Sequence, residues 1–214
     1  MNDLSLEFKS QLQKLFVEKK FSYLEFEIES LGEIQNLDDN LLYLYAISKT
    51  LNHHSKKKDF VLASDLLSKI YKKNKKNLEP LYNLVIVSLK AEIYKKTITI
   101  LLEAFENNPK DEKIIEGLAK LNYVLGNIDD SYEYYKLLFE INPRQVLSRH
   151  PFLTLLNYHS STTQKVYLEQ CKLYSSIIEK NYNYNYDFVS QKIKTNKIKL
   201  GFFSSDYKKH SVSF

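Results

Sequence analysis

An interval of 34 residues separates two prolines that each end a helix-like apolar pattern, and this spacing constrains the fold more than any other feature. Both prolines, Pro109 and Pro143, follow an asparagine. Each proline lies near the end of a unit of 34 residues. When positions are counted back from the proline, large apolar residues and small residues occupy corresponding places in the two units. These are Leu81, Leu84, Thr97, Leu101 and Ala104 in the first unit, and Ile115, Leu118, Ala119, Ser131, Tyr135 and Leu138 in the second. Self-similarity at such a period is typical of repeat proteins.

The length and the pattern are those of a tetratricopeptide (TPR) repeat, a pair of antiparallel helices. Two helices approach closely only where one presents a small side chain, and Ala119 and Ser131 meet that need. Large apolar residues fill the layer between helix pairs, and Gly126 permits the tight turn between the helices of the second unit. The alternative is an ordinary helical bundle with accidental spacing.

Upstream the pattern is looser but continues. It predicts helix pairs at 4–18 with 21–34 and at 40–53 with 59–73, and thus about four helical hairpins in all. Divergent terminal repeats are expected, because one face must be capped toward water. Beyond Pro143 the period stops, and apolar spacing predicts further helices at 146–158 and 163–180. The predicted fold class is therefore mainly α, a TPR-type α-solenoid over 1–143, with a helical connector and linker over 144–196.

The first helices of such a solenoid line a concave face that holds extended peptides. Tyr82, Asn83 and Lys90 are expected there from one hairpin, and Lys120 and Tyr123 from the next. The amide of Asn83 can bond both the N–H and the C=O of a bound backbone without reading its sequence. The alternative is that Asn83 is an ordinary polar surface residue. The predicted partner is a protein or peptide segment.

Composition excludes several classes of protein. The apolar runs are too short to cross a membrane, and four Gly and four Pro are too few for a sandwich or barrel of many short strands. The single Cys171 and an N-terminus without a signal peptide predict a cytoplasmic protein. His53 and His54 lie in a lysine-rich stretch without other ligands, so no metal site is expected. Lysine runs among glutamates are typical of a solvated face, which makes a nucleic-acid partner the weakest hypothesis.

The C-terminal part of the chain differs in charge and composition. Residues 144–214 hold 11 Lys and Arg against 4 Asp and Glu. The stretch 181–187 has the composition of a linker, and a short strand with a following turn is predicted from residue 197. This last segment resembles the opening strand and loop of the catalytic region of SPINDLY-type protein O-linked N-acetylglucosamine transferases. The residues of the resemblance, within 198–214, are Gly201, Ser204, Ser205, Asp206, Tyr207, His210 and the run from Ser211 to Phe214.

Several expectations follow from the resemblance alone. It implies that 197–214 begins a truncated Rossmann-like lobe, and that the whole enzyme transfers N-acetylglucosamine from UDP-GlcNAc to Ser or Thr hydroxyls, with no other cofactor. It assigns catalytic roles to His210 and to His150, for which His159 is an alternative. Phe203 and Tyr207 depart mildly from the Val and Phe usual in the family. The chain as given is expected to be a fragment and inactive. The alternative function is a non-catalytic TPR scaffold that binds peptides or partner proteins.

Overall fold

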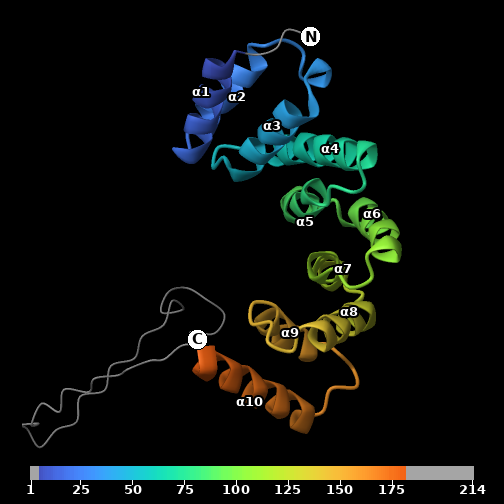
Figure 1. Cartoon of the computed structure of the whole chain (residues 1–214). Coiled ribbons are helices and arrows are strands. Elements are labelled where there is room, and N and C mark those ends of the chain that lie inside the picture. The colour runs from blue at the N-terminus through green and yellow to red at the C-terminus, as the bar shows by residue number, and fades with distance from the viewer. Residues whose placement is uncertain (1–4, 182–214) are drawn as a thin grey trace, which may run out of the picture.

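The computed structural model describes residues 5–181, which form ten α-helices and one 3₁₀ helix and contain no strand. The helices follow one another along the whole described part of the chain (Figure 1). Their bounds are α1 Leu6–Val17, α2 Phe21–Glu29, η1 Ile34–Asn36, α3 Asp39–Leu51, α4 Lys57–Lys73, α5 Glu79–Ala91, α6 Tyr94–Asn107, α7 Glu112–Leu125, α8 Ile128–Ile141, α9 Arg149–Leu156 and α10 Gln164–Asn181.

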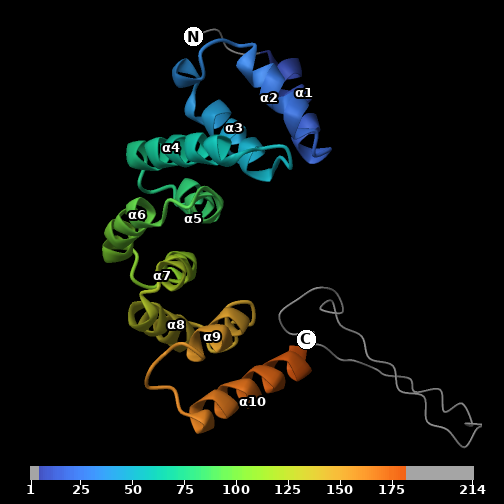
Figure 2. The same ribbon diagram turned by 180° about the vertical axis from the view of Figure 1, so that it is seen from behind.

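Successive helices pair into hairpins that stack into an arc (Figures 1 and 2). The first helices of the hairpins, α3, α5, α7 and α9, lie on the inner side of the arc, and the second helices α4, α6 and α8 lie on the outer side. The N-terminal pair α1 and α2 closes one end, and α10 closes the other. The prediction of a TPR-type helical solenoid is confirmed.

Local signals set the ends of the helices. Asp38 caps α3, because its Oδ1 accepts hydrogen bonds from the backbone N–H groups of Asn40 and Leu41, both at 3.0 Å. Asp111 caps α7 in the same way through Ile114 N–H at 2.9 Å. Gly126 ends α7 with φ of 82°, a left-handed conformation that costs glycine little. These caps satisfy backbone groups that a helix end leaves unpaired.

Small residues bring neighbouring helices together as the repeat pattern predicts. Ser131 is fully buried where α8 crosses α7, and its Oγ donates a hydrogen bond to the carbonyl oxygen of Ala119 at 2.7 Å. Gly117 lies where α7 meets α5 and α6. A Cβ added there would be 2.9 Å from Cγ2 of Val85 and 3.3 Å from Cδ1 of Leu101, so only glycine fits without displacement.

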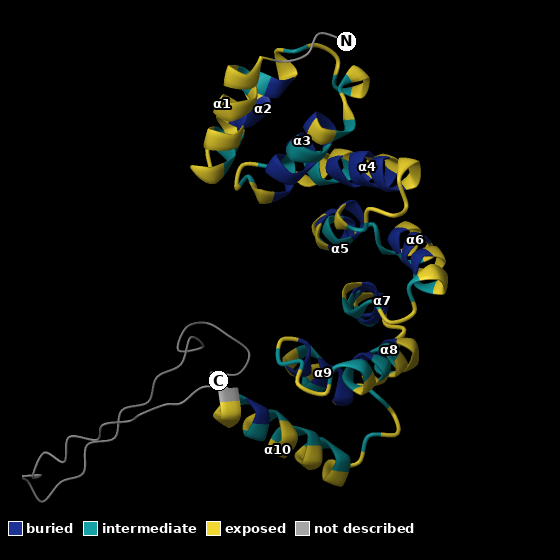
Figure 3. Cartoon of the chain, in the orientation of Figure 1, coloured by how far each residue is buried: buried dark blue, intermediate teal, exposed yellow. Residues whose placement is uncertain are grey.

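The core is a layer between the inner and outer helices (Figure 3). One apolar cluster runs from α1 to α7, and a second joins α7, α8 and α9. The second cluster is rich in aromatic rings: Tyr135, Phe139 and Phe152 lie with their centroids 5.2 to 6.1 Å apart. The apolar core therefore continues past Pro143 to α9.

Two boundaries differ from the sequence predictions. The helix predicted over 21–34 ends at Glu29, because Gly32 takes φ of 127° and the chain then turns through η1. The helix predicted over 146–158 is only Arg149–Leu156. The predicted strand from residue 197, the Rossmann-like lobe that it would begin, the linker beyond Asn181 and His210 lie outside the described residues and stay predictions.

Candidate peptide-binding face

Each first helix presents one stripe of accessible side chains toward the inner side of the arc. On α5 the stripe comprises Glu79, Tyr82, Asn83, Ile86 and Lys90, which recur three or four residues apart. The remaining faces of α5 pack against α4, α6 and α7. Because no described helix covers the inner side, this stripe stays accessible (Figure 1).

Corresponding stripes lie on α3, α7 and α9. Together they form one surface, which we call the inner face. It comprises Tyr43 on α3; Glu79, Tyr82, Asn83, Ile86 and Lys90 on α5; Lys113, Glu116, Lys120, Tyr123 and Val124 on α7; and His150, Thr154 and Tyr158 on α9 and the turn after it. The five predicted peptide-groove residues thus lie on one surface, although their contacts differ.

Asn83 uses both of its amide hydrogens in hydrogen bonds within the protein. Its Nδ2 donates to the hydroxyl oxygen of Tyr43 at 2.9 Å and to the carbonyl oxygen of Glu79 at 3.0 Å. An Asn side chain has two donors and one acceptor oxygen, so only Oδ1 is left for a bound backbone. Asn83 can therefore accept a hydrogen bond from a peptide N–H but cannot also donate one.

Tyr82 is held between the first helices of two hairpins. Its hydroxyl donates to Oδ2 of Asp111 at 2.6 Å, and Nζ of Lys113 lies 4.3 Å from the ring centroid. Nζ of Lys113 also lies 3.5 Å from Oε1 of Glu79. Burial, followed by the hydrogen bond to Asp111, raises the pKa of Tyr82. The phenol is thus a fixed, neutral aromatic surface.

Lys90 points away from the other predicted residues. Its Nζ donates to the carbonyl oxygen of Thr50, in the last turn of α3, at 2.5 Å, and lies 5.3 Å from the ring centroid of Phe60. A cation there satisfies a carbonyl that the helix end leaves unpaired and complements the helix dipole. Lys90 therefore ties α5 to the preceding hairpin.

Lys120 and Tyr123 lie where α7 meets α9. Nζ of Lys120 is 2.8 Å from Oε1 of Glu116, which also accepts a hydrogen bond from the hydroxyl of Ser148. The ring centroid of Tyr123 is 6.3 Å from that of Tyr158. This part of the inner face offers a charged pair beside two partly exposed aromatic rings.

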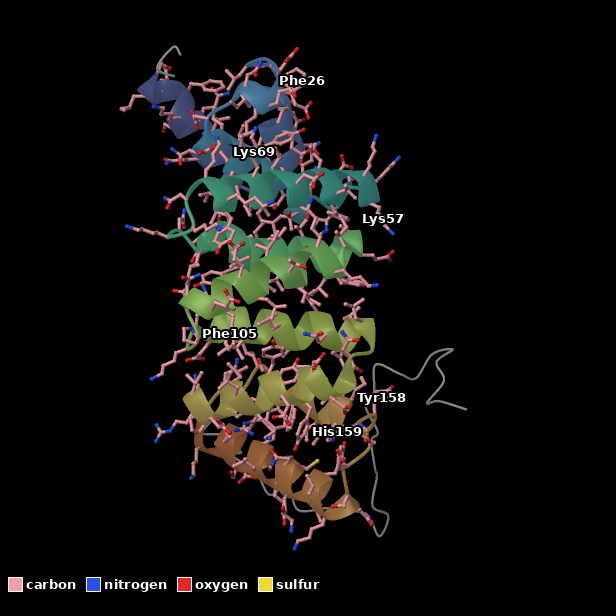
Figure 4. All side chains as sticks on the ribbon, turned by 90° about the vertical axis from the view of Figure 1, so that its right-hand side faces the viewer. Phe26, Lys57, Lys69, Phe105, Tyr158 and His159 are labelled. Carbon is pink, nitrogen blue, oxygen red and sulfur yellow. The ribbon has the colours of Figure 1, made fainter. Side chains whose placement is uncertain are left out.

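The two upstream histidines have different surroundings. His150 is exposed on α9, and within residues 5–181 its ring makes no contact that would fix it. The ring of His159 stacks on Tyr132 with centroids 4.0 Å apart, and its Nε2 lies 3.6 Å from Oδ1 of Asp129. Figure 4 shows His159 beside Tyr158 at the edge of the arc. The structure thus separates a free histidine from a packed one.

A polar cavity of about 410 Å³ opens beside Tyr43. Its lining includes the carboxylates of Asp39 and Glu79 and the amides of Asn74 and Asn77. Sequence reasoning missed Tyr43, because the loop before α4 breaks the regular period. Aligning α3 with α5 at an offset of 40 residues, the interval that separates Tyr43 from Asn83, is the signal that finds it.

Comparison with known proteins shows the fold. No family model matches the sequence, and no curated protein matches it. Solved structures of MamA, a TPR-like helical repeat protein, are similar. The "MamA RS-1 ArsTM double mutant" has a TM-score of 0.69 at 14% identity, covering 85% of this chain and 98% of that one. "MamA 41-end from Desulfovibrio magneticus RS-1" has a TM-score of 0.64 at 13% identity, covering 84% and 96%.

Two further facts concern the described part of the chain. No helix within it is long and apolar enough to cross a membrane. It also contains no cluster of three or more His, Cys, Asp or Glu residues that could hold a metal ion. The described part of the chain has the fold of a TPR-like helical solenoid with an accessible inner face.

Proposed function

We propose that this chain is a non-catalytic, cytoplasmic TPR scaffold that binds an extended segment of a partner protein along the inner face. The observation that supports this function most directly is the continuity of the inner face. Four successive first helices contribute to it, and no described helix covers it. A surface several helices long suits an extended chain better than a small molecule.

The chemistry of the inner face indicates which contacts a bound segment makes. Three exposed apolar or aromatic side chains belong to this face: Ile86 in the middle of α5, Val124 at the end of α7 and Tyr158 in the turn after α9. Burial of such side chains supplies most of the affinity of a protein interface. Oδ1 of Asn83 accepts a hydrogen bond from the backbone of the segment, and the charged pair of Lys120 and Glu116 lies beside the aromatic rings.

Peptide selection tests this proposal. A phage-displayed random peptide library is selected on the full chain, and the enriched peptide is titrated by fluorescence anisotropy. Ile86→Glu places a charge on the inner face, and Leu102→Glu is the matched control on the outer helix α6. The two side chains are 50% and 41% exposed. We expect Ile86→Glu to weaken binding at least tenfold and Leu102→Glu to change it less than twofold.

Two outcomes count against the scaffold function. Equal weakening by the two variants would place the peptide elsewhere, and failure of the library to yield any specific peptide would contradict the proposal. Circular dichroism of both variants shows that a loss of binding is not a loss of folding.

The second candidate function is the N-terminal part of a protein O-GlcNAc transferase. It is supported by the sequence motif within 198–214, which follows helical repeats in the order usual for that family. In this proposal, His210 and the free His150 lie in the cleft for UDP-GlcNAc, and the inner face presents the acceptor protein. UDP titrated into protein from the complete open reading frame tests it. Tight binding of UDP that His210→Ala weakens would favour the transferase. Absence of UDP binding would contradict it and favour the scaffold function.

A further inference from the structure

A second cavity, of about 400 Å³, lies between α8, α9 and α10, away from the inner face. Tyr132, Phe139 and Phe152 give it aromatic walls, and Leu173 of α10 adds an aliphatic one. The polar groups on its lining are those of Lys136, Glu140, Arg149 and Gln170. Apolar walls with a few converging polar groups are the usual character of a small-molecule site.

Arg149 is the unusual residue in this cavity, because it is only 4% exposed and has no carboxylate partner within residues 5–181. Its guanidinium makes one hydrogen bond, from Nη2 to the carbonyl oxygen of Pro143 at 2.8 Å, and stacks on Phe139 with Cζ 4.2 Å from the ring centroid. Its Nε is buried without a partner. Burial lowers the pKa of Arg149. Buried charges in proteins are normally paired, so an unpaired one points to a missing anion.

The other charged groups leave this positive charge uncompensated. Lys136 is exposed and forms an ion pair with Glu133, with Nζ 3.0 Å from Oε2. Glu140 is exposed and makes no ion pair with Arg149. The amide of Gln170 makes no hydrogen bond among the described residues and is free to act on a ligand. Arg149 is therefore the cation on this lining that has no acidic partner among the described residues, and it lies beside a free amide and aromatic walls.

We infer that this cavity binds a small monocarboxylate with an aromatic or branched apolar body. The guanidinium fork of Arg149 matches the two oxygens of a carboxylate, and Gln170 supplies a further hydrogen bond. The body of the ligand packs against Tyr132 and Phe152. A phosphate dianion fits less well, because Lys136, the other cation on the lining, already forms an ion pair with Glu133.

This site is independent of the inner face. Arg149 and Phe152, three residues apart on α9, face the cavity, whereas His150 and Thr154 belong to the inner face. A ligand in the cavity and a peptide on the inner face therefore contact different sides of the same helix.

Calorimetric titration of the full chain with four probes tests the inference. Phenylacetate has the carboxylate and the aromatic body, phenylacetamide lacks only the charge, acetate lacks only the body, and inorganic phosphate replaces the carboxylate. We expect phenylacetate to bind at least tenfold more tightly than the other three. Equal binding of phenylacetate and phenylacetamide, tighter binding of phosphate, or no binding of phenylacetate would each overturn the inference.

Arg149→Met is the variant that separates a binding role from a structural one. Removing an unpaired buried charge relieves its desolvation, so we expect the ligand-free variant to melt at a higher temperature while phenylacetate binding weakens at least tenfold. Arg149→Lys keeps the charge but loses the fork, and should bind with intermediate affinity. A lower melting temperature with unchanged phenylacetate binding would show that Arg149 only braces the turn at Pro143.

Discussion

The buried charge cluster around Lys49 gives the sharpest stability prediction. Its Nζ lies 2.8 Å from Oε2 of Glu25, 3.5 Å from Oε1 of Glu29 and 3.8 Å from Oδ1 of Asp59. The side chains of Lys49 and Glu25 are only 12% and 9% exposed. Burial by itself lowers the pKa of Lys49, but the hydrogen bond and charge of Glu25 raise it by more, so the ammonium stays charged at neutral pH. One cation thus holds three carboxylates from α2 and α4 against α3.

Lys49→Met removes the cation and leaves Glu25 buried. At 2.8 Å, the distance between Nζ of Lys49 and Oε2 of Glu25, the electrostatic attraction of the two charges is about 6 kcal/mol with an effective dielectric constant of about 20. Desolvation of the two ions offsets part of it, and loss of one partner of a buried pair costs about 3 to 5 kcal/mol. Glu29 is half exposed, and Glu25 keeps a hydrogen bond from Asn52. We therefore expect Lys49→Met to lower the free energy of unfolding by about 3 kcal/mol, the lower end of this range.

Urea unfolding, monitored by circular dichroism, measures the loss of unfolding free energy caused by Lys49→Met. The matched control is Lys57→Met at the start of α4 (Figure 4), which breaks the exposed ion pair with Glu92 at the end of α5 and should cost less than about 1 kcal/mol. The double variant Lys49→Met with Glu25→Gln should recover at least about 1 kcal/mol, because it leaves no unpaired buried carboxylate. If Lys49→Met costs no more than Lys57→Met, the reasoning about this cluster is wrong.

Two further predictions concern buried tyrosines and the close approach at Gly117. Burial, followed by the hydrogen bond to Glu29, raises the pKa of Tyr45 to about 12, and burial also raises the pKa of Tyr135. Because unfolded tyrosines ionise near about pH 10, the stabilisation is intact below that pH and is lost as the pH rises toward about 12. Unfolding free energies that stay constant over this range would contradict the prediction. Gly117→Val should cost about 2 to 3 kcal/mol in urea unfolding, because its methyl groups meet Val85, and Val85→Ala should recover part of the loss. An unchanged midpoint would show that the helices part freely there.

The helical part of the fold could be predicted from the sequence because several independent signals in the repeat indicate the same arrangement of helices. The prolines, Gly126 and the small residue Ser131 each specify a local geometry that agrees with the apolar spacing. The end of α2 could not be predicted in the same way, because the turn at Gly32 depends on one backbone conformation and not on a periodic pattern. The role of Gly117 was missed for a related reason: its contact with Val85 joins residues far apart in the sequence.

The helical spacing predicted part of the candidate site, but not Tyr43 or the exposed Ile86, and none of the contacts that its side chains make. Helical spacing places Tyr82, Asn83, Lys120 and Tyr123 on one surface, since that depends only on the period of the helix. The hydrogen bond from the Asn83 amide to Tyr43 depends on how α3 packs on α5. The irregular loop between these hairpins prevents that packing from being predicted from the period. Cavities formed by three helices, such as the one around Arg149, have no periodic signal at all.

Cross-linking of the selected peptide tests the central claim most directly. A photoreactive benzophenone is placed at successive positions of the peptide, and the attachment sites on the full chain are identified by mass spectrometry. We expect attachment to α5, to α7 and to α9 with the turn after it, at residues of the inner face such as Ile86, Val124 and Tyr158. Attachment confined to the outer helices α4, α6 and α8 would contradict it.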